Sequence, residues 1–295
     1  MHIRCVISHL GGTGGVKAAA SFILLIVTER RKPGVWESLR SLLLIDPLIY
    51  LYTGVLGTLS LLSSFVDRDG RIQHGFARLW SKLILKTSMC PLHISGMEKV
   101  DTCKPHIYAV NHASAMDIPS LYVGLPFQFR IMAKKELFRY PFLGWHLKRS
   151  GQIPIERENA RSSLRSLMRA SETVRSGMPL VVFPEGGRTK DGLIQPFLGG
   201  AFYVAIKAGV EIVPMALIGT REALPMNTYV IRPTRFELVV GEPISTEGLA
   251  PRDMDALAAR VQKAVEELYY GHDAVLDRSV KAGSNVGQTA SPANQ

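Results

Sequence analysis

Cysteine is scarce in this 295-residue sequence, which contains only Cys5, Cys90 and Cys103. Three cysteines do not make a disulfide framework, so we expect the chain to reside in a reducing compartment. Cys90 with His93, and Cys103 with His106, resemble two halves of a zinc site. Because His106 directly precedes a buried apolar run, we interpret this spacing as coincidence and expect no metal.

Signatures of nucleic-acid recognition are also missing, since the sequence has no helix-turn-helix, zinc-finger or RNA-recognition pattern. The formal net charge is nevertheless +10, from 35 Lys and Arg residues against 25 Asp and Glu residues. Such a balance indicates an anionic partner. An anionic membrane surface or a phosphorylated substrate fits the sequence better than nucleic acid.

The first 35 residues lack the pattern of a cofactor-binding motif or a signal peptide. Residues 11–15 are glycine-rich, but Lys17 stands where a dinucleotide fingerprint needs its third glycine. Residues 18–27 are apolar but too short to span a bilayer, and a basic run follows instead of a cleavage site. We expect residues 1–35 to form a flexible leader.

Residues 47–65 carry no charge, and at ~1.5 Å per residue a helix of this length approaches the ~30 Å thickness of a hydrocarbon core. Basic side chains flank the stretch on both sides, which fits a segment lying in one face of a membrane better than a single span. Residues 71–86 repeat apolar side chains at helical spacing, with Arg78, Lys82 and Lys86 on another face. This pattern predicts an interfacial amphipathic helix, with a helix packed on the protein's own core as the alternative. We therefore interpret residues 36–90 as a helical membrane-docking segment.

From Ile107 onward short apolar strands alternate with helices, which predicts an α/β domain with a mixed sheet flanked by helices over residues 91–271. The predicted strands cover residues 107–110, 129–132, 153–155, 180–183, 212–218 and 236–240. A last amphipathic helix is expected from about residue 253 to 270. The polar composition of residues 272–295 predicts a disordered tail.

The clearest helix covers residues 160–176 and ends at a glycine. Its expected inward side chains are Leu164, Leu167, Met168 and Val174. Arg161, Arg165 and Arg169 form a stripe on its outer side. The stripe is either a solvated face or a contact for lipid headgroups or a nucleotide phosphate.

The stretch from Asn111 to Asp117 contains the first candidate for catalysis. It joins a buried strand to a helix start, and such a turn lets His112 and Asp117 touch, which a straight helix would not. A carboxylate that accepts from one imidazole nitrogen leaves the other nitrogen free as a base. The alternative is structural, with Asp117 as a helix N-cap and His112 as a hydrogen-bonded loop residue.

Two further stretches carry groups suited to an anionic substrate. Residues 151–157 end a predicted strand with Arg157, and residues 180–189 run from a buried strand into a glycine turn holding Glu185 and Arg188. Glycines let backbone N–H groups approach an anion, and a guanidinium grips phosphate through two hydrogen bonds. Alternatively, both arginines are surface charges and the glycines form a plain turn.

Taken in order, four stretches resemble the blocks of the glycerolipid acyltransferase family, of the 1-acylglycerol-3-phosphate acyltransferase type. The N-H-x4-D block is matched from Asn111 to Asp117, and G-x-I-P-I-x-R is matched from Gly151 to Arg157. The F-P-E-G-T-R-S block is present over residues 183–189, and a V-P-x-A strand over residues 213–216. Two positions depart from the third block, with Gly187 in place of Thr and Thr189 in place of Ser. Gly187 removes a hydroxyl near the expected phosphate site, which leaves the acceptor open.

The resemblance implies transfer of a fatty acyl group from an acyl thioester to the sn-2 hydroxyl of 1-acylglycerol 3-phosphate, giving phosphatidic acid. It implies His112 as general base and Asp117 as its orienting partner, with no serine or cysteine nucleophile; the sequence has no G-x-S-x-G elbow. It further implies an acceptor-binding group on the second and third blocks: Arg157, Glu185, Gly186, Gly187, Arg188 and Thr189. Additional candidates are Asn111, Lys134, Lys135, Gly151 and Pro154. Of these, the lysines are expected to contact headgroups or the donor's phosphate. The sequence leaves the oxyanion-stabilising group open, with backbone N–H groups of residues 151–153 as one candidate.

No cofactor is implied, and the acyl donor is either acyl-CoA or acyl carrier protein. The expected location is the cytoplasmic face of a membrane, the inner membrane if the source is bacterial, held there peripherally or by a single segment. One alternative keeps the chemistry and changes the acceptor to another lyso-lipid or glycerol 3-phosphate. The other is a non-catalytic, membrane-docked lipid-binding protein.

Overall fold

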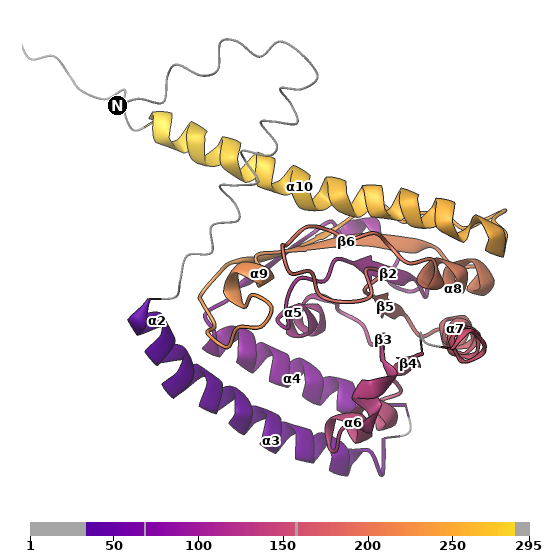
Figure 1. Ribbon diagram of the computed structural model, residues 1–295, viewed down its shortest axis with the longest axis horizontal. Helices are drawn as coiled ribbons and strands as arrows, with labels where there is room; N and C mark the ends of the chain where they lie inside the picture. Colours follow the sequence, from indigo (N-terminus) through magenta and orange to yellow (C-terminus); the bar gives the residue numbers. More distant parts are fainter. Residues whose placement is uncertain (1–33, 68, 157–158, 287–295) are drawn as a thin grey trace, which may run out of the picture.

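The computed structural model describes residues 34–286 apart from 68 and 157–158, so residues 1–33 of the expected leader, and Arg157, lie outside the described residues. Residues 34 and 35 of that leader are described, as the N-cap and the first residue of a helix. Within this part of the chain, seven strands form one mixed sheet in the order β1-β7-β6-β2-β5-β3-β4 (Figure 1). Their bounds are β1 Leu92–Ser95, β2 Ile107–Val110, β3 Arg130–Lys134, β4 Ile153–Ile155, β5 Leu180–Val182, β6 Ile212–Ile218 and β7 Phe236–Val240. Neighbouring strands are parallel except β6 and β7, which are antiparallel. The predicted mixed sheet is confirmed.

Helices cover both faces of the sheet. One face carries α7 (Ala160–Arg175), α8 (Gly200–Ala208) and α10 (Met254–Val286). The other carries α4 (Arg71–Thr87) and α5 (Asp117–Gly124), with α3 (Asp46–Ser63) outside α4. The remaining helices are α2 (Val35–Arg40), α6 (Leu143–Arg149) and α9 (Thr220–Ala223). A π-helical turn, Ser41–Ile45, joins α2 to α3. Three 3-10 turns cover Met97–Lys99, Lys135–Arg139 and Pro251–Asp253.

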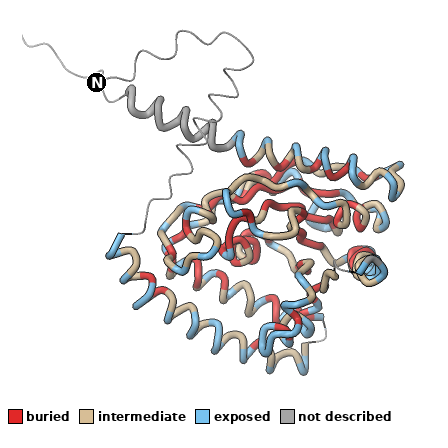
Figure 2. The backbone as a smooth tube through the Cα atoms, in the orientation of Figure 1, coloured by how far each residue is buried: buried red, intermediate tan, exposed pale blue. Residues whose placement is uncertain are grey.

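Strand β2 shows why the central strands are nearly continuous apolar runs. Ile107 and Ala109 face the core under α7, α8 and α10, whereas Tyr108 and Val110 face the core under α4 and α5. A strand of a parallel sheet covered by helices on both faces must be apolar at every position, because successive side chains point to opposite faces. Figure 2 shows these buried positions concentrated between the helical layers.

The N-terminal helices differ from the expectation in one respect. The predicted interfacial helix is α4, but it lies between α3 and α5 and buries Ile84 and Leu85 in the protein core. The alternative, a helix packed on the protein itself, is therefore what the structure shows. Its apolar stripe is explained by packing, and the most exposed apolar helix surface belongs to α2 and α3.

Helix α7 begins at a side-chain cap, since Asn159 accepts from the backbone N–H groups of Arg161 and Ser162. Val174 is fully buried as expected. Leu164 and Met168 are 46% and 50% exposed, so their assignment to the inner face is wrong. Leu167 packs against the core as expected. The physical reason for the difference is that α7 contacts the core through Leu167, Ala170 and Val174, a stripe too narrow to include Leu164 and Met168.

Two boundaries also differ. The sequence predicts the last helix to end near residue 270, whereas α10 continues to Val286. Glycine and serine cost at most about 1 kcal/mol each relative to alanine in a helix, so a few of them do not end one. Strand β1 was not predicted, because it lies at the edge of the sheet and two of its four residues are exposed, which leaves little apolar pattern.

Candidate active site

Three of the four sequence blocks carry polar side chains that follow parallel strands of the sheet. His112 follows β2, Glu185 follows β5 and Glu156 follows β4, and all three strands run in the same direction. Their carboxyl ends therefore meet at one edge, where ligands bind in open α/β sheets. The fourth block is β6, which pairs with β2 and supports the His112 loop from the other side.

Asn111 fixes the point where the chain leaves β2. Its side-chain amide donates to the carbonyl oxygen of Leu217 at 3.0 Å and accepts from the Leu217 N–H at 2.8 Å. These two bonds extend the β2–β6 pairing by one residue through a side chain. The buried Asn111 amide therefore has a protein partner for both its N–H donor and its oxygen acceptor, and it fixes the backbone from which His112 extends.

His112 and Asp117 are in direct contact. The Nδ1 atom of His112 lies 2.7 Å from Oδ2 of Asp117, and the Asp117 side chain is 1% exposed against 18% for His112. The same Oδ2 accepts the backbone N–H groups of Ala113 and Ser114, each at 2.9 Å. A carboxylate that only accepts hydrogen bonds requires a proton on Nδ1, and this leaves Nε2 as the basic nitrogen. Asp117 is the first residue of α5, with Met116 as N-cap, so the simple N-cap alternative is not what the structure shows.

Glu185 holds the His112 loop in place through hydrogen bonds. One carboxylate oxygen accepts the backbone N–H of His112 at 2.6 Å, and the other accepts the backbone N–H of Gln195 at 2.9 Å. Burial raises the pKa of Glu185, and the two N–H groups that favour the charged form oppose this rise. The geometry thus gives Glu185 a positioning role, whereas its contact with substrate stays a prediction.

The imidazole of His112 is also held by an aromatic ring. Phe183 stacks on it with ring centroids 4.0 Å apart and an angle of 25° between the planes. Neither Phe183 nor Gln195 was predicted from the sequence to belong to the site. Phe183 belongs to the third block and could have been predicted from it, but nothing in the sequence indicates that the backbone N–H of Gln195 bonds to Glu185.

The glycine turn after β5 leaves its arginine in solvent. Gly186 has φ +79°, a conformation that favours glycine, while a Cβ added at Gly187 would meet nothing within 4 Å. Arg188 is exposed and Thr189 is buried. The Thr189 hydroxyl donates to Asp191 at 2.5 Å, and its backbone N–H donates to the His112 carbonyl oxygen at 2.9 Å. Thr189 therefore ties this turn to the His112 loop.

The other candidates fall into two groups. Lys134 ends β3 at the same edge of the sheet and is exposed, and Lys135 is paired with Glu156. Gly151 precedes β4 with φ +73°, and Pro154 lies within β4 opposite Ala133. The lysines are thus on the side of the candidate site, while Gly151 is at the opposite end of its strand.

That placement corrects the expectation for the oxyanion. The N–H of Gly151 donates to the carbonyl oxygen of Lys148 at 3.3 Å, and the N–H of Gln152 donates to that of Leu147 at 2.9 Å. Both groups complete the end of α6 and precede β4, so they do not face His112. The sequence motif suggested proximity, but a strand separates its glycine from the site.

Among the described residues, no cluster of three or more His, Cys, Asp and Glu side chains is placed to hold a metal ion. Cys90 is buried and Cys103 is exposed. The two half-sites suggested by their spacing are therefore not assembled in this part of the chain.

Comparisons with known proteins agree with this geometry. Residues 91–218 match the family model described as Acyltransferase. The chain is 34% identical to the chloroplastic 1-acyl-sn-glycerol-3-phosphate acyltransferase BAT2 of Brassica napus, over 60% of this chain and 52% of that protein. It is 32% identical to the chloroplastic 1-acyl-sn-glycerol-3-phosphate acyltransferase LPAT1 of Arabidopsis thaliana, over 59% and 49%. The chain thus spans about half the length of these curated relatives.

A solved structure shares the fold. The 1-acyl-sn-glycerophosphate (LPA) acyltransferase PlsC of Thermotoga maritima superposes with a TM-score of 0.64 at 25% identity, covering 79% of this chain and 97% of that one. The resemblance stated from the four blocks is confirmed.

Proposed function

Because residues 91–218 belong to the acyltransferase family, we propose that this protein transfers a fatty acyl group from an acyl thioester to the sn-2 hydroxyl of 1-acylglycerol 3-phosphate, giving phosphatidic acid. One observation carries the proposal. His112, oriented by buried Asp117, stands at the edge of the sheet where the other blocks converge. The relatives and the solved neighbour named as acylglycerophosphate acyltransferases support the same reaction.

In this reaction Nε2 of His112 takes the proton of the acceptor hydroxyl as its oxygen attacks the thioester carbonyl carbon. Asp117 stabilises the imidazolium that forms and keeps Nδ1 protonated. This attack forms the C–O bond of the new ester, and collapse of the tetrahedral intermediate re-forms the carbonyl and breaks the C–S bond. The departing thiolate receives the proton from His112, so the base is restored and no acyl-enzyme is needed.

We assign binding of the acceptor's phosphate to the arginines. Arg188 is exposed beside the Gly186 turn, at the same edge of the sheet as His112, and a guanidinium binds phosphate through two parallel hydrogen bonds. Arg157 follows β4 in sequence and joins this proposal through the family resemblance, as it lies outside the described residues. Lys134 adds positive charge from the end of β3.

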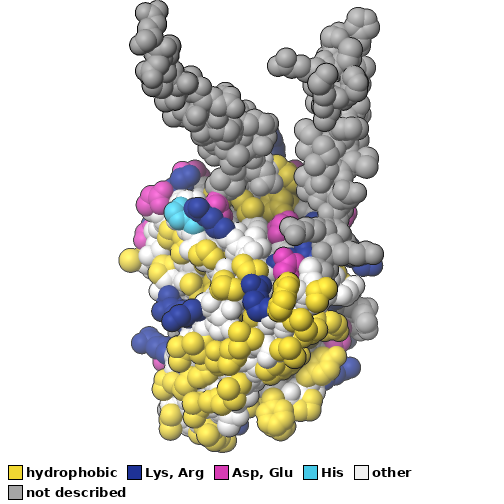
Figure 3. Space-filling view, turned by 90° about the vertical axis from the view of Figure 1, so that its left-hand side faces the viewer, with side chains coloured by type: hydrophobic (Ala, Val, Ile, Leu, Met, Phe, Trp, Pro, Cys, Tyr) yellow, Lys and Arg dark blue, Asp and Glu magenta, His cyan; other side chains and the backbone are white. Residues whose placement is uncertain are grey.

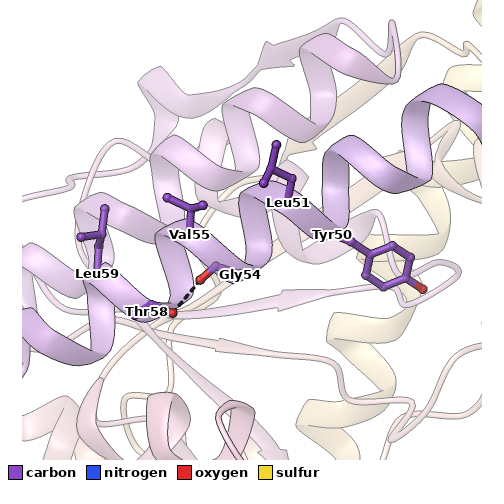
Figure 4. Close-up of a pocket in the computed structure, with 6 residues that line it drawn as sticks. All are labelled: Tyr50, Leu51, Gly54, Val55, Thr58 and Leu59. Carbon is purple, nitrogen blue, oxygen red and sulfur yellow. Dashed lines mark hydrogen bonds between the residues drawn. The ribbon is translucent and has the colours of Figure 1, made fainter.

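The substrates of such an enzyme reside in membranes, and α2 and α3 supply a surface for one. The helix from Val35 to Ser63 is the one in the described chain that is long and apolar enough to cross a bilayer. Figure 3 shows hydrophobic side chains gathered over the lower part of the face that it displays. A shallow apolar depression on α3 is lined by Tyr50, Leu51, Gly54, Val55, Thr58 and Leu59 (Figure 4).

Polar contacts hold the inner side of α3 against the protein, which favours a helix lying in the membrane surface over one that leaves the protein to span it. Thr53 accepts from the Trp80 indole N–H at 2.9 Å, and the Ser60 hydroxyl lies 3.2 Å from Nδ1 of His146. Spanning would break these contacts, whereas lying flat keeps them and buries the outer face in lipid. We place this surface on the cytoplasmic side, because Cys90 and Cys103 are free thiols.

The test is thiol release from palmitoyl-CoA by the purified protein in detergent, with and without 1-acylglycerol 3-phosphate. We expect acceptor-dependent release that falls by about 10³-fold or more in His112→Ala, because the base is lost. An unchanged unfolding midpoint in the variant excludes a folding defect. Activity of His112→Ala near that of the wild type would overturn the proposal.

The space beside Gly187 favours a second candidate acceptor. With no side chain there and nothing within 4 Å of an added Cβ, the turn has room for a headgroup larger than phosphate. The same assay with glycerol 3-phosphate and with other lyso-lipids decides between the acceptors. Binding of phosphatidic acid without thiol release from any donor would instead indicate a lipid-binding protein.

A further inference from the structure

Arg221 is a cation at the catalytic edge of the sheet that none of the four sequence blocks contains. It lies on α9, which begins two residues after the end of β6, and β6 pairs with β2. Arg188 follows β5 on the other side of β2, so the strand order places His112 between the two arginines. Neighbouring strands are ~4.8 Å apart, which puts the ends of β5 and β6 about 10 Å from each other. Two guanidinium groups thus flank the catalytic base.

Helix α9 is joined directly to the loop that carries His112. The carbonyl oxygen of Leu224, the residue after α9, accepts the hydroxyl of Ser114 at 2.8 Å. Ser114 is fully buried and stands two residues after His112. This bond limits the movement of α9 relative to the base, so Arg221 keeps a defined position beside it.

The side chain of Arg221 lies across the backbone of Gly192. A Cβ added at Gly192 would stand 2.7 Å from Cδ and 2.8 Å from Nε of Arg221, so the contact requires glycine. Gly192 also has φ +86°, a conformation that favours glycine. Its N–H donates to the Thr189 hydroxyl at 3.2 Å, and the Thr189 N–H donates to the His112 carbonyl oxygen at 2.9 Å. The guanidinium is therefore placed against the same loop that carries Arg188.

Most hydrogen-bond donors of Arg221 are open to a ligand. Within the described residues its side chain makes one hydrogen bond, from Nη2 to the Lys190 carbonyl oxygen at 3.5 Å, and no ion pair. A guanidinium has five N–H donors in a planar fork. A single bond at the upper limit of length leaves most of this half-buried fork unused. An anion with several acceptor oxygens would use it.

The charges around this loop favour an anion with more than one negative charge. Three cations of the loop and α9 stand against one carboxylate of the loop: Arg188, Lys190 and Arg221 against Asp191. The Asp191 carboxylate accepts a hydroxyl and an N–H group of its own loop, and the hydroxyl is the main cause of its lowered pKa. Glu222, the next residue on α9, is exposed, and successive helix positions differ in direction by about 100°. A phosphate monoester, with a charge of about −1.5 to −2 at pH 7, fits this surplus of positive charge.

We propose that Arg221 binds the phosphate of the acceptor together with Arg188, and that this pair makes the site select a phosphate monoester over a phosphodiester of the same lyso-lipid. The inference rests on the proposed function, because it assigns a residue and a preference to the acceptor site. Arg188 reaches the phosphate from the β5 side and Arg221 from the β6 side, with the sn-2 hydroxyl directed to His112. Since an added Cβ at Gly187 would meet nothing within 4 Å, the selection is electrostatic and not steric.

The test compares two acceptors that share an acyl chain and differ in the phosphate. These are 1-acylglycerol 3-phosphate, a monoester, and 1-acylglycerol 3-phosphoglycerol, a diester, each assayed in detergent at saturating palmitoyl-CoA. In Arg221→Gln we expect KM for the monoester to rise by about tenfold or more, because a charge-assisted contact is lost. KM for the diester, and kcat for both acceptors, should change by less than about threefold, because the base is untouched.

Two further variants and a matched control sharpen the comparison. Gly192→Ala keeps Arg221 but displaces it, since the added Cβ stands where its side chain lies, so the same selective rise in KM is expected. Arg221→Lys keeps the charge and loses the fork, so KM for the monoester should rise less than in Arg221→Gln. Arg175→Gln is the control: Arg175 also donates to a main-chain carbonyl, that of Lys207, but at the opposite edge of the sheet. It should change neither KM.

Binding without catalysis separates this site from the reaction. Calorimetric titration of 1-acylglycerol 3-phosphate into the full-length His112→Ala protein, with and without Arg221→Gln, measures the acceptor site alone. We expect Arg221→Gln to raise Kd by about tenfold or more. If the wild type releases no thiol with any acceptor while binding depends on Arg221, the proposed reaction fails and the site stands. If the wild type is active and Arg221→Gln matches it, the site fails and the reaction stands.

Three kinetic results would contradict the assignment: an unchanged KM for the monoester in Arg221→Gln, an equal rise in KM for both acceptors, or an equal fall in kcat for both. The last result would mean that Arg221 only holds the loop through its bond to the Lys190 carbonyl oxygen. Unfolding midpoints of all variants are measured beside the kinetics. Where glutamine lowers the midpoint, Arg221→Lys decides the question, because it keeps the aliphatic stem that packs on Gly192.

Discussion

At the scale of single residues, Asp117 accepts more hydrogen bonds than its contact with His112 alone requires. Its Oδ2 accepts from Nδ1 of His112 and from two backbone N–H groups. In Asp117→Asn an amide oxygen at the Oδ2 position still accepts from the two backbone donors and from Nδ1, but the negative charge is lost. The imidazolium that forms when His112 takes the proton is then no longer stabilised by a carboxylate. We expect kcat for thiol release to fall by about 10³- to 10⁴-fold.

The unfolding midpoint of Asp117→Asn, measured by circular dichroism, separates this effect from loss of structure. Asn has nearly the volume of Asp and keeps one acceptor, so the midpoint should stay within a few degrees of wild type. A loss of activity below tenfold would mean that His112 does not need its carboxylate and would remove the assigned role of Asp117.

Glu185 allows a similarly sharp prediction, because positioning and substrate binding differ in their kinetics. In Glu185→Gln one oxygen becomes a donor that faces a backbone N–H, and an unmade buried hydrogen bond costs about 1–3 kcal/mol. We expect the His112 loop to shift and kcat to fall about 10- to 100-fold, with little change in KM for 1-acylglycerol 3-phosphate. A rise in KM at constant kcat would restore the substrate-binding role that the resemblance implied.

Residue patterns predicted the contact between His112 and Asp117 well and its surroundings poorly. His112 and Asp117 are close in sequence, so a single turn decides whether they meet, and the strand before them was readable. The Glu185 carboxylate joins the backbone N–H groups of His112 and Gln195, and backbone donors leave no trace in a sequence. The oxyanion expectation was wrong for a related reason, since the direction of β4 decides which end of the block faces His112.

At the scale of secondary structure, the strands were predictable because burial on both faces demands continuous apolar runs. The surroundings of helices were harder to predict, because an amphipathic stripe indicates an apolar neighbour but does not show whether that neighbour is protein or lipid. Helix α4 has the stripe of an interfacial helix and packs on α5. Its buried polar residues Gln73, His74 and Ser81 distinguish the two cases, and they are visible only once the packing is known.

His74 gives the α4 packing a measurable pH dependence. Burial lowers the pKa of His74 to about 4, assisted by the positive charges of Arg78 and Arg130, from an ordinary value of 6.5. The folded protein therefore holds His74 neutral while the unfolded chain binds a proton, so stability is complete above pH 6.5 and is lost as the pH falls toward 4. The loss amounts to about 3 kcal/mol at most, at 1.36 kcal/mol per pH unit.

Denaturant unfolding of His74→Leu between pH 7 and pH 4 tests this account. Leucine fits beside the rings of Tyr122 and Phe129, whose centroids lie 5.1 Å from that of the imidazole, and it does not titrate. The variant should lose stability less steeply on acidification. His93→Leu, at an exposed position in β1, is the matched control and should keep the wild-type slope. Equal slopes for all three proteins would show that His74 does not govern the acid sensitivity.

At the scale of the whole molecule, two of the exposed apolar surfaces lie on opposite sides of the sheet. Helix α3 carries an outer face of exposed leucine, valine and tyrosine side chains, and α7 carries a smaller apolar strip among arginines. The first is wide, uncharged and continuous with α2, and the second is narrow and basic.

Substitution of α3 tests the membrane side of this arrangement. Leu51→Glu with Val55→Glu places two carboxylates on an apolar face, where these residues are 58% and 51% exposed. Each apolar side chain contributes about 1.5 kcal/mol or more when it enters lipid, so binding to phosphatidylglycerol vesicles should weaken about 100-fold or more. Stability in detergent-free buffer should be unchanged, because neither side chain is buried in the protein.

The matched control for this variant is Leu164→Glu with Met168→Glu, which makes the same chemical change at similarly exposed positions on α7. Vesicle flotation should retain the control and the wild type and release the α3 variant, because only α3 faces the bilayer. Acyl transfer to acceptor in vesicles should follow the same order, while transfer to acceptor dissolved in detergent survives in the α3 variant since His112 is untouched. If both double variants leave the vesicles together, the two surfaces share one membrane, and the assignment of membrane binding to α3 alone is wrong.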